Sequence, residues 1–373
     1  MLLLVGLLAF SWRAEAFVFY RVAGNVMRWN LNNAGLHPNV VNPATKAIRY
    51  YIASDVYSTT NRVHEINAIR AAFDQWQMVP GTNLKFEFAG FVSPEGLDAR
   101  YDNMNVIFWA KNSLLVAAGT QNLNGRRAWT SVNFAVDGSI LDADIVLNGL
   151  QYTWYTDYQR TNTSHVFVES ILLHEIGHFL GLDHSPAGGA TVLSGASGIA
   201  SELGLSADDS AGLRFLNPAA NTTWASLQGK IRMNGSPVLG AMVIVEDAAG
   251  NIAGATVSDA SGDYLVPSLA AGNYRLRVTP FDPPGTATLL RGEDIAPDYA
   301  NAVTGFLPTT NFPFSLTATQ ARVQDVVLTP IMHDSAGEIA QAFEPKDWKR
   351  GECEPVPGKT MPSIAVVERD YPN

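Results

Sequence analysis

The sequence has very little cysteine, few charged residues and no long apolar run, and each scarcity argues against a class of protein. Cys353 is the single cysteine in 373 residues, which excludes an intramolecular disulfide framework. Charged residues make up 16% of the chain, and the net charge is −10. Because binding to nucleic-acid phosphates needs clustered Lys and Arg, we expect no nucleic-acid partner. No run of like charge is long enough to form an interaction tail.

An apolar run at residues 2–10 is too short to span a bilayer, and Arg13 follows it. We therefore expect no membrane span. The pattern Ala14-Glu15-Ala16 is typical of the cleavage site of a secretory signal. We predict a signal peptide over residues 1–16 and a secreted, extracellular protein; a buried first strand is the alternative.

The length and the 47% of apolar residues are sufficient for two domains with separate cores. The residue pattern changes after a polar linker at residues 217–224, where short alternating segments begin. We predict a first domain over residues 17–220 and a second over residues 226–330. The segment 331–373 is rich in Pro and charge, and we expect a poorly ordered tail there.

Helical and strand patterns are mixed in the first domain, which indicates an α+β fold. Apolar residues from Ile66 to Trp76 repeat at helical spacing and predict one long helix. A second helix is expected from His165 to about Leu180, with Ser164 as its N-cap and Gly181 as its end. A third helix should cover residues 205–216, with Ser206 as its cap. The segments that predict strands are RWNLN (28–32) and residues 47–54, 105–110, 128–134 and 140–149.

The second domain consists of short alternating segments separated by Gly, Asn, Asp and Pro turns. Their even spacing predicts an all-β sandwich, with residues 322–330 as its last strand. The segments are GKIRMNG, AMVIVED, AGATVSD, DYLVPS, NYRLRVTP and RVQDVVLTP.

The stretch LLHEIGHFLGLDHSP holds three of the seven histidines. On a helix, His174 and His178 project from one face, and Gly181 lets the chain turn so that His184 returns toward them. Three neutral imidazoles leave one position open on a tetrahedral Zn²⁺, as in catalytic zinc sites. Glu175 can take a proton from a metal-bound water and give it to a departing amine. The alternative is a set of surface or hydrogen-bonded core histidines.

The pattern HExxHxxGxxH resembles that of the metzincin metallopeptidases. HEIGHFLGLDHS, with Ser185 at its end, resembles the matrixins, the matrix-metalloproteinase family, and LSADDSAGLRFL is similar to the family's C-terminal helix. The similarity extends over about residues 26–217. It implies a metzincin-type catalytic domain with a mixed twisted sheet, a long helix and a zinc-binding active-site helix.

The resemblance also implies a zinc metalloendopeptidase, with His174, His178 and His184 as ligands and Glu175 as general base. An extended peptide or protein substrate would pair with residues 128–134. DASGDYLVPSLAAGNYRLRV, in the second domain, resembles the carboxypeptidase regulatory-like, transthyretin-type sandwich, for which we expect an accessory binding or spacing role.

The sequence departs from the metzincin pattern below the zinc. No methionine occurs between Met104 and Met233, so we expect Leu193 or Val192 in the place of the family's methionine. Cys353 is expected to be a free tail thiol, with a thiolate ligand as the alternative.

Two further interpretations stay open. Family members hold structural Ca²⁺ near this sheet, and Asp142 and Asp144 are candidates for it; two solvated strand carboxylates are the alternative. A different functional class is a secreted adhesion or binding protein with a weak or inactive metzincin scaffold. The sequence carries no signal of oligomeric state.

Overall fold

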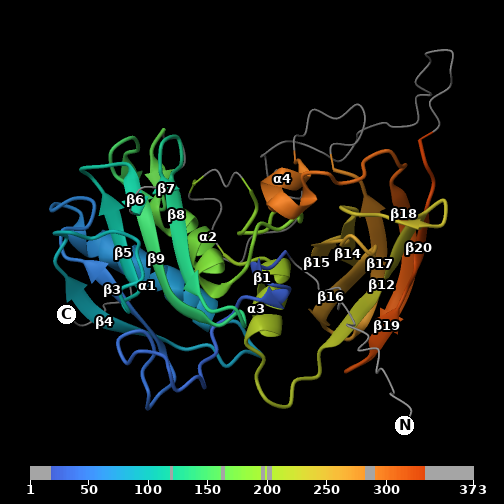
Figure 1. Cartoon of the computed structure of the whole chain (residues 1–373), viewed down its shortest axis with the longest axis horizontal. Coiled ribbons are helices and arrows are strands. Elements are labelled where there is room, and N and C mark those ends of the chain that lie inside the picture. The colour runs from blue at the N-terminus through green and yellow to red at the C-terminus, as the bar shows by residue number, and fades with distance from the viewer. Residues whose placement is uncertain are drawn as a thin grey trace, which may run out of the picture.

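The computed structural model describes residues 18–117, 121–160, 164–194, 198–199, 204–281 and 290–331. They form two lobes, the first mixing helices with strands and the second built mainly from strands (Figure 1). The expected signal peptide and the expected tail, including Cys353, lie outside the described residues, apart from Ile331. Within the described part of the chain, no helix has the length and apolar character needed to cross a membrane.

A five-stranded sheet in the order β4-β3-β5-β9-β8 forms the centre of the first lobe. Four of its strands are parallel, and β8 is antiparallel to β9 at one edge, so the sheet is mixed as expected. The edge strand β4 was not predicted from the sequence. Gly90 interrupts the alternation of apolar and polar residues in this strand, next to a shift in the register between β3 and β4. The strands are β3 Ile48–Ala53, β4 Phe86–Val92, β5 Val106–Ala110, β8 Ala128–Phe134 and β9 Ile140–Asn148.

Short strand pairs complete the first lobe. They are β1 Arg21–Val22 with β2 Asn25–Val26, β6 Leu115–Ala117 with β7 Gln121–Asn122, and β10 Trp154–Tyr155 with β11 Val166–Phe167.

The long predicted helix is present as α1, Arg62–Gln77, and packs against α2, Val168–Leu180. Its apolar face carries Phe73 and Trp76, both fully buried, and the Trp76 indole donates to the Leu173 carbonyl at 3.0 Å. A buried indole with a satisfied N–H fixes the depth and register of its partner helix. The position of α2 in the lobe is therefore set by α1 behind it.

The start of α2 differs from the expectation. The helix begins at Val168 and not near Ser164, because Val166 and Phe167 form β11, which pairs in parallel with β10. Phe167 is extended and makes no side-chain cap. Every residue of α2 is buried, so tertiary packing supports the helix end that capping leaves unsupported.

The third helix, α3 Ala207–Leu216, begins as predicted. Ser206 and Asp209 form a reciprocal capping box, which satisfies two backbone donors of the first turn. The expected strand RWNLN is wrong, because only Arg28 makes an isolated bridge, to Ser139. The side chain of Trp29 takes a different role: its indole N–H donates to the Phe179 carbonyl of α2 at 2.8 Å.

The second lobe consists of two sheets, as expected for sandwich-like strands. One sheet contains β12 Ala225–Met233, β13 Ser236–Pro237, β16 Asp263–Leu269, β19 Ala321–Val323 and β20 Val326–Leu328. The other has the order β15-β14-β17-β18, with β14 Met242–Asp247, β15 Ile252–Val257, β17 Gly272–Thr279 and β18 Thr309–Leu316. A short helix, α4 Gly292–Ile295, and a 3₁₀ turn, Pro297–Tyr299, lie between β17 and β18.

The expected last strand, residues 322–330, is broken into β19 and β20, which both pair with β12. The chain bulges at Gln324, whose backbone lies over Gly229; a Cβ on Gly229 would come within 2.1 Å of the Gln324 oxygen. The close approach therefore needs glycine on β12.

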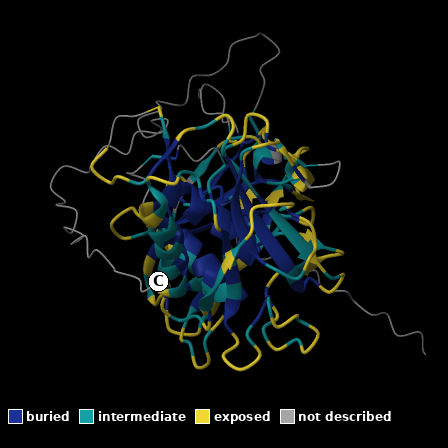
Figure 2. Cartoon of the chain, turned by 90° about the vertical axis from the view of Figure 1, so that its left-hand side faces the viewer, coloured by how far each residue is buried: buried dark blue, intermediate teal, exposed yellow. Residues whose placement is uncertain are grey.

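The two lobes share buried surface. Helix α3 packs against β15 and β16 of the second lobe, and one cluster of buried apolar residues runs through both lobes. Figure 2 shows buried residues in the central helices and strands, with exposed residues gathered in the surrounding loops.

Candidate metal centre

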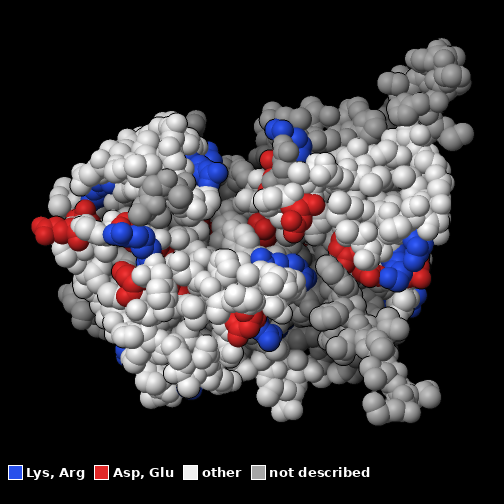
Figure 3. All heavy atoms as spheres, in the orientation of Figure 1, with Lys and Arg blue, Asp and Glu red and all other residues white. Residues whose placement is uncertain are grey.

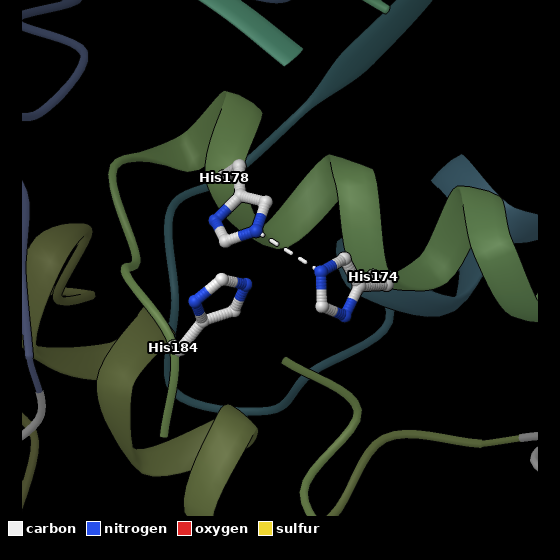
Figure 4. Close-up of side chains that lie close together, drawn as sticks. All are labelled: His174, His178 and His184. Atoms are coloured by element: carbon white, nitrogen blue, oxygen red, sulfur yellow. Dashed lines mark hydrogen bonds between the residues drawn. The ribbon is translucent and has the colours of Figure 1, made fainter. Parts of the chain in front are cut away.

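Helix α2 and the turn that follows it position three histidines. His174 and His178 lie one turn apart on α2, which ends at Gly181 with a φ of 104°. A Cβ on Gly181 would come within 2.3 Å of the Met27 oxygen, so both the backbone angle and the space require glycine. The reversed chain then brings His184 back to face the helix (Figure 4).

The three imidazoles converge on one point. One ring nitrogen from each histidine lies within 4.8 Å of the corresponding nitrogens of the other two. Among the described residues, these three side chains form the cluster that is compact enough to hold a metal ion. The Nε2 atoms of His174 and His178 are 3.0 Å apart. Two nitrogens bound to one tetrahedral Zn²⁺ at about 2.0–2.1 Å would lie about 3.3 Å apart. The observed spacing therefore fits shared coordination.

The partners of the rings show which nitrogens are free to bind a cation. His174 Nδ1 is 2.9 Å from the Thr191 carbonyl, and His178 Nδ1 is 2.8 Å from the Leu182 carbonyl. A carbonyl only accepts, so both Nδ1 atoms carry the proton and both Nε2 atoms present lone pairs. Two lone pairs facing each other at 3.0 Å repel unless a cation lies between them. The tautomers thus favour a metal site over a hydrogen-bonded core.

The pKa values of the three rings agree with neutral ligands. Burial, together with the neighbouring His184, lowers the pKa of His174 to about 3. Burial and the two other rings hold the pKa of His178 well below its usual range. The pKa of His184 is also lowered, mainly by burial. All three rings are neutral at physiological pH, as metal binding requires.

Glu175 lies beside the first histidine and is held by the edge strand. The Thr130 hydroxyl of β8 is 2.5 Å from Glu175 Oε2 and 3.0 Å from its main-chain oxygen. Burial raises the pKa of Glu175 to about 7, while the bond from Thr130 opposes the rise. No sequence motif marks Thr130; its position in the strand predicted at residues 128–134 is the signal that could have identified it.

A valine lies in the place expected for the metzincin methionine. A Cβ on Gly177 would come within 2.7 Å of Val192 Cγ2, so Val192 packs directly beneath α2. Leu193 instead packs with Ile244 and Ala255 of the second lobe. The backbone N–H groups of residues 191 and 192 both donate to Asp209, which holds this support under the histidines.

Asp142 and Asp144, the candidates for calcium, lie apart from the three histidines. Both are buried on β9, which contradicts the alternative of two solvated carboxylates. Asp142 accepts from the Met104 N–H at 3.0 Å, and Asp144 accepts from the Val106 N–H at 2.8 Å. Burial and the charge of Asp102 raise the pKa of Asp142 to about 7. A calcium ion there stays a prediction.

Two residues near the rings carry no sequence signal, because they come from distant segments. Tyr20 lies in an N-terminal segment that pairs with residues 181–183, and its hydroxyl is 3.2 Å from His178 Nδ1. Asp294, in α4 of the second lobe, lies near enough to His184 that its backbone and its charge raise the pKa of the ring against the effect of burial. Neither interaction follows from local spacing.

The surface is hollowed between the two lobes (Figure 3). In this view the lobe that carries β8 borders the hollow on one side and α4 borders it on the other, with acidic side chains gathered on the α4 side (Figures 1 and 3).

Comparisons with known proteins match the two lobes separately. Residues 42–217 match the family model described as Matrixin, and residues 226–289 match the Carboxypeptidase regulatory-like domain. A segment of 48 residues is 73% identical to the respiratory nitrate reductase alpha chain of Bradyrhizobium sp and 65% identical to that of respiratory nitrate reductase 1 of Escherichia coli (strain K12). That segment is 13% of this chain and only 5% and 4% of those proteins, so their activity is not carried over.

Similarity to solved structures is partial. The Bacillus anthracis TIE protein is 12% identical at a TM-score of 0.22, with 29% of this chain and 18% of that chain covered. The Klebsiella pneumoniae 5-hydroxyisourate hydrolase is 19% identical at a TM-score of 0.19, with 28% and 85% covered. Neither likeness carries an argument about function. Residues 42–217 are thus similar to the matrixin family of metallopeptidases, and residues 226–289 are similar to the carboxypeptidase regulatory-like domain.

Proposed function

We propose that this protein is a secreted zinc endopeptidase of matrixin type. The observation that carries the proposal is the convergence of unprotonated imidazole nitrogens beside a buried glutamate. His174, His178 and His184 would hold the zinc, and three protein ligands leave one position for water or substrate. The match of residues 42–217 to the matrixins supports the choice of zinc.

Bound zinc would polarise the substrate carbonyl and make a water acidic enough to lose its proton near neutral pH. Glu175 is the base that accepts this proton and then delivers it to the departing amine. Its buried carboxyl has a pKa raised to about 7, which suits a group that both takes and gives a proton near neutrality. The hydrogen bond from Thr130 holds the Glu175 carboxylate in position. The Thr191 and Leu182 carbonyls orient the rings of His174 and His178.

An extended peptide is the substrate class that the sheet fits. β8 is the edge strand next to α2, and no other described strand pairs with its outer side. Main-chain groups of an edge strand bind a peptide as an added strand. Thr130 points inward from the same strand to Glu175, so a peptide along β8 would pass beside the metal ligands. Export, predicted from residues 1–16, fits this activity as part of the proposal.

Zinc content and turnover of casein test the proposal on the full chain. Wild type should hold about one zinc per chain, and His178→Ala should lose it. Glu175→Gln should keep the zinc and cleave about 10²- to 10⁴-fold more slowly. Equal cleavage by wild type and Glu175→Gln, insensitive to a chelator, would instead favour an adhesion protein with an inactive scaffold.

A further inference from the structure

A buried carboxyl group of α3 connects the loop after the third histidine to the second lobe. Asp208, in the first turn of α3, is 1% exposed. Its Oδ2 accepts from the Ser185 hydroxyl and its Oδ1 accepts from the Ala255 N–H of β15, each at 2.6 Å. Ser185 directly follows His184, and Ala255 belongs to the second lobe. Asp208 therefore contacts both the turn that carries His184 and the second lobe.

Ser185 is held at its backbone as well as at its side chain. Its N–H donates to the Val192 carbonyl at 2.8 Å, and its hydroxyl oxygen accepts from the Ala187 N–H at 3.0 Å. The bond to Asp208 adds a contact with helix α3 at this point of the loop. Because the backbone of residue 185 continues directly from His184, these bonds also restrict the backbone that aims the His184 side chain.

The second lobe fixes the other oxygen of Asp208. β15 is the edge strand of its sheet, and its Ala255 N–H donates across the boundary between the lobes. Around this bond, Ala187 and Ala190 of the loop cluster with Ile244 and Ala255 of the second lobe. A buried carboxyl oxygen that loses its donor is unfavourable, so without the Ala255 N–H the side chain of Asp208 would move. The position of Asp208 thus depends on how the lobes pack together.

We propose that Asp208 is a positioning residue for the third metal ligand: it holds the turn that carries His184, and the second lobe holds Asp208 through Ala255. The inference rests on the proposed zinc site and gives the accessory lobe a role beyond spacing. Loss of a group that orients a metal ligand costs about 10- to 100-fold in metal affinity. Since Asp208 acts through the backbone next to His184 and not on its ring, we expect a loss of about tenfold.

Two buried serines allow a matched comparison. The Ser185 hydroxyl donates at 2.6 Å and accepts from a backbone N–H at 3.0 Å. The Ser258 hydroxyl, in the second lobe, also donates at 2.6 Å and accepts from a backbone N–H at 3.0 Å. Ser185→Ala and Ser258→Ala therefore lose similar contacts, but only Ser185→Ala loses a contact beside His184.

Ala255→Pro tests the contribution of the second lobe. Proline has no N–H, and at an edge position whose N–H leaves the sheet it removes the bond to Asp208 and not a bond between strands. Ala255→Gly is its control, because it keeps the N–H and trims only the methyl group.

The experiment measures two properties of the full chain. One is amide hydrogen exchange of residues 184–192 in the metal-free protein, and the other is Zn²⁺ affinity by competition with a chromophoric chelator. We expect Ser185→Ala and Ala255→Pro to exchange faster in this loop and to bind Zn²⁺ about tenfold more weakly, with an altered absorption spectrum of the Co²⁺ form. Ser258→Ala and Ala255→Gly should match wild type. Melting of each metal-free variant shows whether it is folded, and if Ala255→Pro is not, Ser185→Ala decides.

Three results would overturn the inference. A folded Ser185→Ala variant with the loop exchange and Zn²⁺ affinity of wild type would show that Asp208 does not hold the turn. An equal loss in Ser258→Ala would assign the effect to general stability. A folded Ala255→Pro variant that matches wild type would exclude the second lobe from this role. If wild type binds no Zn²⁺, the proposed function is refuted, while loop exchange in the metal-free chain still tests the support from Asp208.

Discussion

The hydrogen bond between Thr130 and Glu175 should control the chemical step more than substrate binding. The Thr130 hydroxyl has one proton, and the 2.5 Å contact with Oε2 is shorter than the 3.0 Å contact with the main-chain oxygen, so the proton goes to the carboxylate. A hydrogen bond to a charged group contributes about 1.5–3 kcal/mol. Since about 1.4 kcal/mol is tenfold in rate, Thr130→Val should lower kcat about 10- to 100-fold.

The assay compares kcat and KM for a quenched fluorogenic peptide among wild type, Thr130→Val and Thr130→Ser. Thr130→Val keeps the shape of the side chain and loses only the donor, so KM and zinc content should change little. Thr130→Ser keeps the hydroxyl and should recover most of the rate. A Thr130→Val enzyme with wild-type kcat, or a Thr130→Ser enzyme as slow as Thr130→Val, would refute the positioning of Glu175 by β8.

Three other predictions concern the rest of the site. Asp208→Ala leaves the Ser185 hydroxyl and the Ala255 N–H without an acceptor, and should lower the free energy of unfolding by about 2–4 kcal/mol, measured by urea denaturation with Asp208→Asn as the milder control. Because burial raises the pKa of Asp142 to about 7, its contribution to stability is fully present below about pH 4 and is lost as the pH rises through 7. Asp142→Asn should therefore flatten the dependence of the melting temperature on pH between about pH 4 and 7. An unchanged slope would contradict the raised pKa of Asp142. Tyr20→Phe removes a hydroxyl from His178 Nδ1, which also contacts Leu182 at 2.8 Å, so Zn²⁺ affinity measured by chelator competition should fall only about two- to tenfold.

Local patterns in the sequence were sufficient for the elements that carry the histidines. Spacing by four placed two rings on one face of α2, and the glycine at 181 marked the helix end that returns the third. Ser206 was recognised as a cap because its partner Asp209 lies only three residues away. In each case the interacting groups are close in the chain, so backbone geometry alone decides whether they meet.

Where the prediction failed, the deciding contact is distant in sequence. The start of α2 depends on a parallel pairing between residues 154–155 and 166–167, which no capping rule reveals. The strand expected at RWNLN was lost because Trp29 packs its indole against α2, 150 residues away. Strand propensity is weak beside the burial of a large aromatic side chain.

The missing methionine shows how a departure from a family pattern can be resolved by packing. Val192 lies so close to Gly177 of α2 that a Cβ at position 177 would come within 2.7 Å of it, and the backbone N–H of Val192 donates to Asp209. The rings are thus supported by Val192, which is smaller than methionine, and by the hydrogen bonds of the backbone around it. Tyr20, which hydrogen-bonds His178, and Asp294, which influences the pKa of His184, lie outside both family matches, at residues 42–217 and 226–289. The histidine motif accounts for the ligands, while the setting that orients them is built by segments that the motif does not contain. Metal affinity depends on the segments that orient the ligands, so we expect it to differ more between this chain and the matrixins than the reaction does.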